Sequence, residues 1–145
     1  MIAIGSDHGG FHLKQEIMKH LDELGLAYHD YGAYSTESCD YPAYGEAVAH
    51  AVASGACERG ILVCGTGIGI GIAANKVHGI RCATCSDCYC AEMSRRHNDA
   101  NILALGERVT GVGLAMKIVD AFLNAEFEGG RHARRVALIG QIEEK

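Results

Sequence analysis

The sequence predicts an α/β fold in which helices cover both faces of a parallel β-sheet. Short apolar segments alternate five times with longer segments of helical periodicity along the 145 residues. This alternation is typical of strand–helix–strand units joined by right-handed crossovers. The apolar segments contain almost no polar residues, as expected for strands whose sheet is buried on both faces. The length suits one domain with a substantial core, so we expect residues 1–145 to form a single domain.

The first half of the chain contains three strand–helix units. In the first helix, apolar residues recur at the 3.6-residue spacing until Gly25 ends the pattern. Pro42 occupies a favoured first position of the second helix, and Gly55 follows its end. The expected elements are strands at 2–6, 26–31 and 61–64 and helices at 11–24, 43–53 and 68–77.

The second half continues the same alternation. Its strands are short and rich in alanine, isoleucine and leucine, and its helices are longer and carry charged residues. A glycine pair at 129–130 separates the last helix from the rest. The expected elements are strands at 80–85 and 101–105 and helices at 87–97, 109–123 and about 132–144.

Composition and charge disfavour several kinds of partner. The net charge is −5 and no basic run is present, so we expect no nucleic-acid partner. No apolar segment approaches the roughly 20 residues that cross a bilayer. We therefore expect no membrane partner. Residues 1–5 lack the basic start of a signal peptide, so we do not expect them to be one. The seven cysteines, an odd number, favour free thiols in a reducing cytoplasm.

Two loops with reactive side chains are expected to meet at one edge of the sheet. Open parallel sheets bind ligands beyond the carboxyl ends of their strands, where the strand order reverses. The first strand ends in Asp7-His8-Gly9-Gly10 and the third in Cys64-Gly65-Thr66-Gly67. We expect these two strands to be neighbours. Asp7 and His8 are explained equally well as helix-capping residues or as a carboxylate and an imidazole that face a ligand.

The segment 60–71 predicts a buried strand, a glycine-rich turn and a helix N-terminus, with Cys64 at the junction. Backbone N–H groups and the helix dipole at such a junction favour an anion and activate a neighbouring thiol. We therefore interpret Cys64 as a base rather than as a core cysteine, although buried cysteines are common in strands. The amides that follow would hold a developing oxyanion. Thr66 would cap the helix, bind a substrate oxygen, or do both.

The same glycines have an alternative interpretation as a dinucleotide-binding fingerprint. The segment 69–74 fits G-x-G-x-x-A, and Asp87 follows the next strand, where a ribose acceptor could stand. The match is weak because the glycines begin several residues after the strand ends. The chain also has no room for a second, substrate-binding domain. A P-loop is excluded because no G-x-x-x-x-G-K-[ST] sequence is present.

Four cysteines, Cys82, Cys85, Cys88 and Cys90, are spaced closely enough to suggest a zinc or iron–sulfur site. The first two fall in a predicted strand, where they point to opposite faces, and the other two fall at a helix start. Four ligands in these positions do not converge. We therefore expect no metal and interpret these residues as small, buryable side chains.

Basic residues in the C-terminal half suggest an anion site. Arg131 and Arg135 lie four residues apart on one helix face, and guanidinium groups bind phosphate bidentately. A solvated basic face is the simpler alternative. His97 ends a helix that runs back from the ligand edge for about 15 Å, so we expect it on the far side of its own sheet from Cys64. It is either a helix-end histidine that interacts with the dipole or a residue that acts on another subunit.

Several longer motifs follow one another along nearly the whole chain. They are Gly5–Phe11, Asp40-Tyr41-Pro42, Cys64–Gly69, Ala73–Lys76, Ser94–Asp99 and Glu128–His132. In identity and order they resemble the ribose-5-phosphate isomerase B family, which also includes galactose-6-phosphate and allose-6-phosphate isomerases. The resemblance implies a three-layer, Rossmann-like α/β/α sandwich with five parallel strands in the order 2-1-3-5-4. It also implies an enzyme without a cofactor or metal, and a homodimer or homotetramer with active sites shared between subunits.

The resemblance further implies roles for single residues. Cys64 is similar to the base that moves a proton between C1 and C2 of the substrate, and His97 to the acid that opens the furanose ring, with Asp7 nearby. The expected catalytic residues are Cys64, His97, Thr66 and Asp7. The expected substrate-binding residues are Asp7, His8, Gly65, Thr66, Gly67, Ile68, Gly69, Asn98, Arg108, Arg131 and Arg135. Among them, the resemblance implies that His8, Arg131 and Arg135 contact the phosphate.

These implications predict an aldose–ketose isomerase that interconverts D-ribose 5-phosphate and D-ribulose 5-phosphate through an enediolate. An allose-6-phosphate or galactose-6-phosphate isomerase is the alternative within the same chemistry, because the length of the pocket is not readable from the sequence. A nucleotide- or sugar-phosphate-binding module without catalysis is the alternative from a different class.

Overall fold

The computed structural model describes residues 1–145 and contains one five-stranded sheet. All strand pairs are parallel, and the strand order is β2-β1-β3-β5-β4, which confirms the predicted fold class. The strands are β1 (Ile2–Ser6), β2 (Tyr28–Asp30), β3 (Arg59–Cys64), β4 (Cys82–Thr84) and β5 (Ile102–Gly106). The α-helices are α1 (Phe11–Glu23), α2 (Tyr41–Ala53), α3 (Ile68–Ala74), α4 (Cys88–Arg96), α5 (Val112–Asn124) and α6 (Arg131–Glu143), and a 3₁₀ turn covers His8–Gly10.

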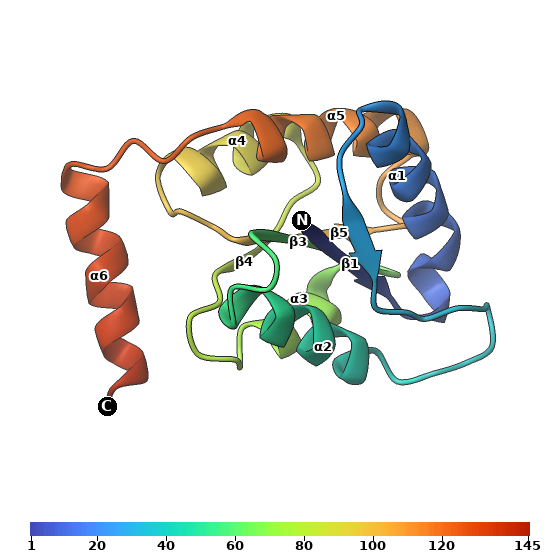
Figure 1. The fold of residues 1–145 in the computed structure, drawn as a ribbon, viewed down its shortest axis with the longest axis horizontal. Coiled ribbons are helices and arrows are strands. Elements are labelled where there is room, and N and C mark those ends of the chain that lie inside the picture. Colours follow the sequence, from blue (N-terminus) through green and yellow to red (C-terminus); the bar gives the residue numbers. More distant parts are fainter.

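Two hydrophobic layers hold the sheet between its helices (Figure 1). Helices α1, α4 and α5 cover one face, and α2 and α3 cover the other. Successive residues of β3 alternate between the layers: Ile61 and Val63 belong to the first core cluster, whereas Leu62 and Cys64 belong to the second. This is the period-2 alternation of an extended strand. The uninterrupted apolar strands of the sequence are thus explained by burial on both faces.

The predicted boundaries are longer than the observed ones at both edge strands. β2 begins at Tyr28 rather than at residue 26, because the Leu26 N–H still bonds to the end of α1, at the Leu21 carbonyl. β4 spans only Cys82–Thr84 instead of the predicted 80–85. Each of these strands pairs with a single neighbour, so fewer ladder hydrogen bonds extend them.

Most helix ends lie within two residues of their predicted positions, but two helices differ by three residues at one end. α3 ends at Ala74 rather than at residue 77, and a turn follows it. α5 begins at Val112 rather than at residue 109, because the Val109 and Thr110 N–H groups bond to the Gly106 carbonyl and form a separate turn. Local hydrogen bonds of this kind do not alter the apolar periodicity from which the ranges were predicted.

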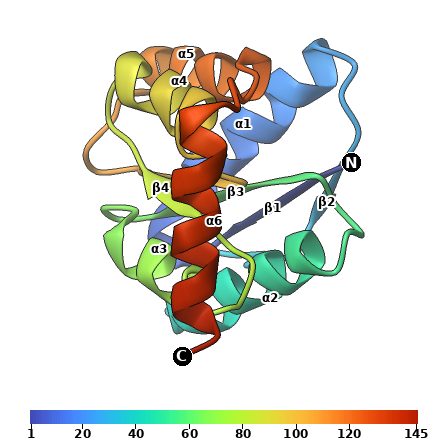
Figure 2. The same ribbon diagram turned by 90° about the vertical axis from the view of Figure 1, so that its left-hand side faces the viewer.

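Helix α6 lies at one side of the molecule, joined to the body by an extended segment after α5 (Figure 1), and runs from the α4 side of the sheet toward the α3 side (Figure 2). It contains no buried residue, and its apolar side chains Leu138, Ile139 and Ile142 are 53%, 44% and 65% exposed. Its far end reaches the body of the molecule, where Glu143 accepts from the Gly79 N–H at 3.0 Å. None of the α-helices has the length and apolar character that a bilayer crossing requires.

Candidate active site

The strand order reverses between β1 and β3, and this position organises the site. β1 and β3 pair directly, with Ser6 opposite Val63, so both strands end at the same edge. From there β2 lies outward on one side, and β5 and β4 lie on the other. The loops after β1 and β3 therefore meet, as the sequence predicts: a Cβ placed on Gly9 would lie 3.4 Å from the Gly65 nitrogen.

Cys64 is the last residue of β3, and its side chain is almost enclosed, with 5% exposure. Its sulfur accepts a hydrogen bond from the Gly67 N–H at 3.1 Å. A donor in this position stabilises negative charge on the sulfur. The carbonyl of Cys64 is held by the Glu107 N–H at 2.9 Å, so β5 fixes the strand end.

The loop after Cys64 needs glycine at its centre. Gly67 has φ of 80°, and a Cβ there would lie 2.8 Å from the carbonyl carbon of Leu105. Both the left-handed conformation and the close approach to β5 exclude a larger residue. The N-cap of α3 is Gly67 rather than Thr66, but the Thr66 hydroxyl accepts from the Ile68 N–H at 3.2 Å and so satisfies one N–H group of the first helical turn. Thr66 is exposed, so its hydroxyl remains accessible to a ligand.

Asp7 and His8 border the other side of the crevice. Asp7 is buried, and its carboxylate accepts from the Gly10 N–H at 3.1 Å, so the capping interpretation is correct for this oxygen. His8 receives the Cys39 N–H on Nδ1 at 3.2 Å. Because Nδ1 is the acceptor, the ring proton of a neutral His8 lies on Nε2. His8 therefore presents an N–H donor away from the Cys39 loop.

Arg108 completes this group of residues. Its N–H donates to the Gly65 carbonyl at 3.1 Å, and its guanidinium lies along the loop, where a Cβ on Gly65 would be 3.5 Å from Nη1. A cavity of about 370 Å³ opens beside the loop, next to Thr66 and Ile68. A larger hollow of about 1280 Å³ lies over α2 and α3 and contains none of the predicted site residues.

The remaining predicted residues form a second group at the opposite end of β5. Cys64 is paired with Gly106, the last residue of β5, whereas His97 precedes the first residue of that strand. The four steps along β5 alone cover about 13 Å. His97 follows α4 as its C-cap, and Asn98 comes next and is exposed.

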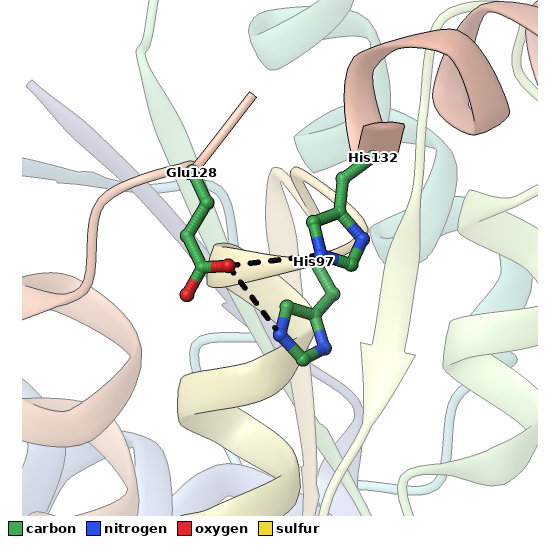
Figure 3. A group of neighbouring side chains, drawn as sticks. All are labelled: His97, Glu128 and His132. Atoms are coloured by element: carbon green, nitrogen blue, oxygen red, sulfur yellow. Dashed lines mark ion pairs between the residues drawn. The ribbon is translucent and has the colours of Figure 1, made fainter. Parts of the chain in front are cut away.

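His97 lies beside the segment that leads into α6. Its ring stacks on that of His132, with centroids 4.2 Å apart, and Glu128 lies next to both (Figure 3). Arg131 is the first residue of α6 and Arg135 lies one turn further on; both are exposed. The predicted site residues are thus divided between two half-sites. The first contains Asp7, His8, Gly65–Gly69, Cys64 and Arg108, and the second contains His97, Asn98, Arg131 and Arg135.

Residues beyond those predicted from the sequence contribute to both half-sites. In the first, Tyr41 covers the loop, since a Cβ on Gly69 would lie 2.7 Å from its ring. In the second, Glu128 and His132 surround His97. Glu128 and His132 belong to the motif Glu128–His132, and membership of that motif is the only sequence signal that could have indicated a functional role for them. Their proximity to His97 is not readable from the sequence, because about 30 residues of chain separate them from it.

The four clustered cysteines do not converge. Cys82 packs against the α2/α3 side of the sheet, and Cys85 belongs to the core on the other face. Burial raises the pKa of Cys82 to about 12 and that of Cys85 to about 11, so both are thiols at neutral pH. Cys88 and Cys90 lie in the first turn of α4. The free thiols therefore have no common centre.

The dinucleotide interpretation of the glycine loop also fails on geometry. Gly69 and Gly71 lie inside α3 instead of in the turn that precedes it. Asp87 accepts the Cys90 N–H at 2.7 Å as the N-cap of α4. Hydrogen bonds from the Cys90 backbone and side chain lower the pKa of this carboxylate. Asp87 therefore serves a helix terminus, where its charge is stabilised.

Fold and loop geometry together define an enzyme of the doubly wound α/β class, with a thiol at the strand ends where this class binds ligands. Residues 2–139 match the protein family described as Ribose/Galactose Isomerase. The chain belongs to this family.

Full-length relatives agree with this assignment. Ribose-5-phosphate isomerase B of Escherichia coli is 56% identical over 144 residues, which cover 99% of this chain and 97% of that protein. D-erythrulose-4-phosphate isomerase of Pectobacterium atrosepticum is 48% identical and covers 98% of this chain and 94% of its own. The structure of ribose-5-phosphate isomerase B from Clostridium thermocellum has a TM-score of 0.98 at 62% identity, covering 99% of this chain and 97% of the other.

Proposed function

We propose that this enzyme interconverts D-ribose 5-phosphate and D-ribulose 5-phosphate without a cofactor. The observation that carries the proposal is the position of Cys64. Its sulfur lies at the switch point of the sheet, 3.1 Å from the Gly67 nitrogen and at the start of a loop of backbone amides. This arrangement combines a base with donors for an oxyanion. Full-length similarity to ribose-5-phosphate isomerase B supports ribose 5-phosphate as the substrate.

The first step is the opening of the furanose ring. In our proposal, His97 donates a proton to the ring oxygen O4 while the C1–O4 bond breaks and its electron pair goes to O4. The hydroxyl on C1 loses its proton to water and becomes the aldehyde. His97 then recovers a proton from solvent, so the step consumes nothing. Its location at the C-terminal end of α4, with 38% side-chain exposure, leaves the imidazole accessible to a sugar.

The second step transfers hydrogen from C2 to C1. The Cys64 thiolate removes the C2 proton, the C–H electrons form a C1–C2 double bond, and the aldehyde oxygen takes the negative charge. The proton on O2 passes to O1, the proton held by sulfur returns at C1, and O2 becomes the ketone. A thiolate is too weak a base for this carbon unless the enediolate is stabilised. Loss of one oxyanion donor costs about 3 kcal/mol in other enzymes, so the amides of residues 65–69 matter as much as the base.

Contacts to the phosphate, which lies remote from the reacting carbons, orient the substrate in the site. His8 offers an N–H donor from the first half-site, and Arg131 and Arg135 offer guanidinium groups from the second. Arg108 and Asn98 are assigned to the hydroxyl groups of the sugar. No position within one chain brings all these groups around a single substrate, because the half-sites lie at opposite ends of β5.

We therefore propose a homodimer, or a homotetramer built from such dimers, in which each active site takes one half-site from each subunit. The uncovered apolar side chains of α6 support this assembly, because an amphipathic helix without a buried residue requires a partner for its apolar face. A cytoplasmic location is proposed as well, since all seven cysteines are free thiols.

The test replaces the base and keeps the substrate contacts. We expect Cys64→Ala to abolish conversion of ribose 5-phosphate while retaining binding of the sugar phosphate, measured by calorimetry. Cys57→Ala is the matched control, because Cys57 is equally buried in the same core cluster but lies outside the site. Turnover of the Cys64→Ala variant near the wild-type rate would remove the base assignment. Assays with excess chelator, and with allose 6-phosphate and galactose 6-phosphate, test the absence of a metal and the sugar preference.

A further inference from the structure

Glu128 occupies a position that the two catalytic steps above do not explain. It lies in the segment between α5 and α6 and faces the rings of His97 and His132 (Figure 3). One carboxylate oxygen, Oε1, lies 3.7 Å from Nε2 of His97 and 3.6 Å from Nε2 of His132. The acid assigned to ring opening is thus in contact with a carboxylate from a distant part of its own chain.

The other oxygen of Glu128 is fixed by Arg96. Oε2 accepts from Nε of Arg96 at 2.8 Å and lies 2.7 Å from Nη2. The backbone N–H of Glu128 also donates to the Arg96 carbonyl at 3.0 Å. Three contacts to one residue determine where the carboxylate lies, and they leave Oε1 directed at the neighbouring imidazole rings. Because Arg96 immediately precedes His97, Glu128 and His97 are held on the same helix end.

His132 restricts the ring of His97 from the other side. The two rings are stacked, with an angle of 8° between their planes. The His132 side chain is only 11% exposed. Burial, together with the nearby His97 and Arg131, lowers the pKa of His132, so this ring is neutral at neutral pH.

A metal ion is a less suitable occupant of the group. The three side chains offer two nitrogens and one carboxylate, which is a plausible ligand set by composition. However, the lone pair of an imidazole nitrogen lies in the plane of its ring, and these two planes are parallel. The lone pairs therefore cannot both point at one ion. The group is therefore better described as a carboxylate that lies beside two stacked imidazole rings, at ion-pair distance from both.

We propose that Glu128 is a positioning residue for His97: anchored by Arg96, it holds the His97 imidazole in the orientation from which it donates a proton to the ring oxygen. This inference rests on the proposed function and deepens it, because it assigns a second residue to ring opening alone. The carboxylate touches no reacting atom. It acts on His97 as a carboxylate beside a catalytic histidine acts, by fixing the orientation of the imidazole ring.

The experiment separates ring opening from proton transfer by the choice of substrate. D-ribose 5-phosphate is cyclic, whereas D-erythrose 4-phosphate cannot form a furanose because its C4 oxygen carries the phosphate. For Glu128→Gln, we expect kcat on ribose 5-phosphate to fall by about tenfold to a hundredfold, a partial loss of the roughly hundredfold to ten-thousandfold that general acid catalysis contributes. Turnover of erythrose 4-phosphate should stay within about twofold of the wild type.

Glu92→Gln is the matched control. Glu92 also pairs with Arg96, at 3.3 Å, and has no contact with His97. The control variant should retain both activities, which excludes the loss of an Arg96 partner as the cause. Equal losses on both substrates for Glu128→Gln, or no loss on either, would overturn the proposal.

A second measurement decides the matter independently of any acyclic substrate. The Cys64→Ala variant cannot isomerise but retains His97, so it should accelerate exchange between the α and β anomers of ribose 5-phosphate, observed by NMR saturation transfer. Adding Glu128→Gln should remove most of this acceleration, and adding Glu92→Gln should not. Undiminished exchange in the Cys64→Ala, Glu128→Gln double variant would refute the role of Glu128. A wild-type enzyme without activity on ribose 5-phosphate would refute the proposed function itself.

Discussion

Mixing two inactive variants tests whether the site is divided between subunits. Within one chain, Cys64 is paired with the last residue of β5 and His97 precedes the first, a separation of about 13 Å along the strand alone. A C1–C2 unit cannot contact both side chains of the same chain. We therefore expect Cys64→Ala and His97→Asn to be strongly impaired singly and to complement each other in a heterodimer.

The size of the recovery follows from symmetry. Random reassortment of equal amounts of the two variants makes about half of the dimers mixed, and a two-fold dimer has two equivalent sites. In each mixed dimer, one site combines an intact Cys64 with an intact His97, and the other site lacks both. Recovery should thus reach about one quarter of the wild-type activity per protein. If each site were built from a single chain, no chain would carry both groups and the recovery would be zero.

The assay mixes differently tagged variants in urea, refolds them together and follows the conversion of ribose 5-phosphate. Native mass spectrometry establishes that heterodimers are present. A matched control mixes Cys64→Ala with Arg108→Ala, both in the first half-site. Because each site then contains one lesion in that half, mixing should add nothing to the activity of Arg108→Ala alone. Heterodimers of the first pair that lack activity above the separate variants would refute a shared site.

Two further predictions concern stability and thiol chemistry. Lys14 is fully buried and pairs with Asp30 at 2.7 Å, so Lys14→Met should lower the free energy of unfolding, measured in urea, by about 3 kcal/mol. As the control, Lys19→Met at an exposed position should change it by less than about 0.5 kcal/mol. Equal effects of the two substitutions would contradict this account. Cys85 has a pKa of about 11, so its alkylation in the native protein at pH 8 should be about a hundredfold slower than in unfolded protein. At pH values below that pKa, the alkylation rate of Cys85 should rise about tenfold per pH unit, because the thiolate fraction rises by that factor. Peptide mass spectrometry measures the rate, and a rate that does not change with pH would contradict the prediction.

The elements and their order can be predicted from the sequence because each depends on local periodicity. The alternation of apolar and polar residues placed all five strands and all six α-helices, and the errors lie at element ends. The end of α3 at Ala74 and the start of α5 at Val112 are set by individual turn hydrogen bonds, which have no apolar signature. The site loop was found for a similar reason, since Gly67 and Cys64 are neighbours in sequence.

Residues that act together across long stretches of chain were harder to find. Glu128 and His97 are separated by about 30 residues, and their contact depends on how the segment after α5 returns to the end of α4. The anchoring of Glu128 by Arg96 depends on the same return. No spacing rule connects such positions, because their proximity is a property of the packed helices.

The sequence alone determined that this protein is a parallel α/β enzyme with a thiol and glycine loop at its strand ends, because strand periodicity, the loop and its cysteine are all local features. It also indicated that His97 lies far from Cys64, since the length of one helix sets that distance. The tertiary structure decided what surrounds each half. It packed Tyr41 onto the loop, bonded Cys39 to His8, and brought Glu128 and His132 to His97. These contacts join segments remote in sequence, so only the packing of the complete chain specifies them.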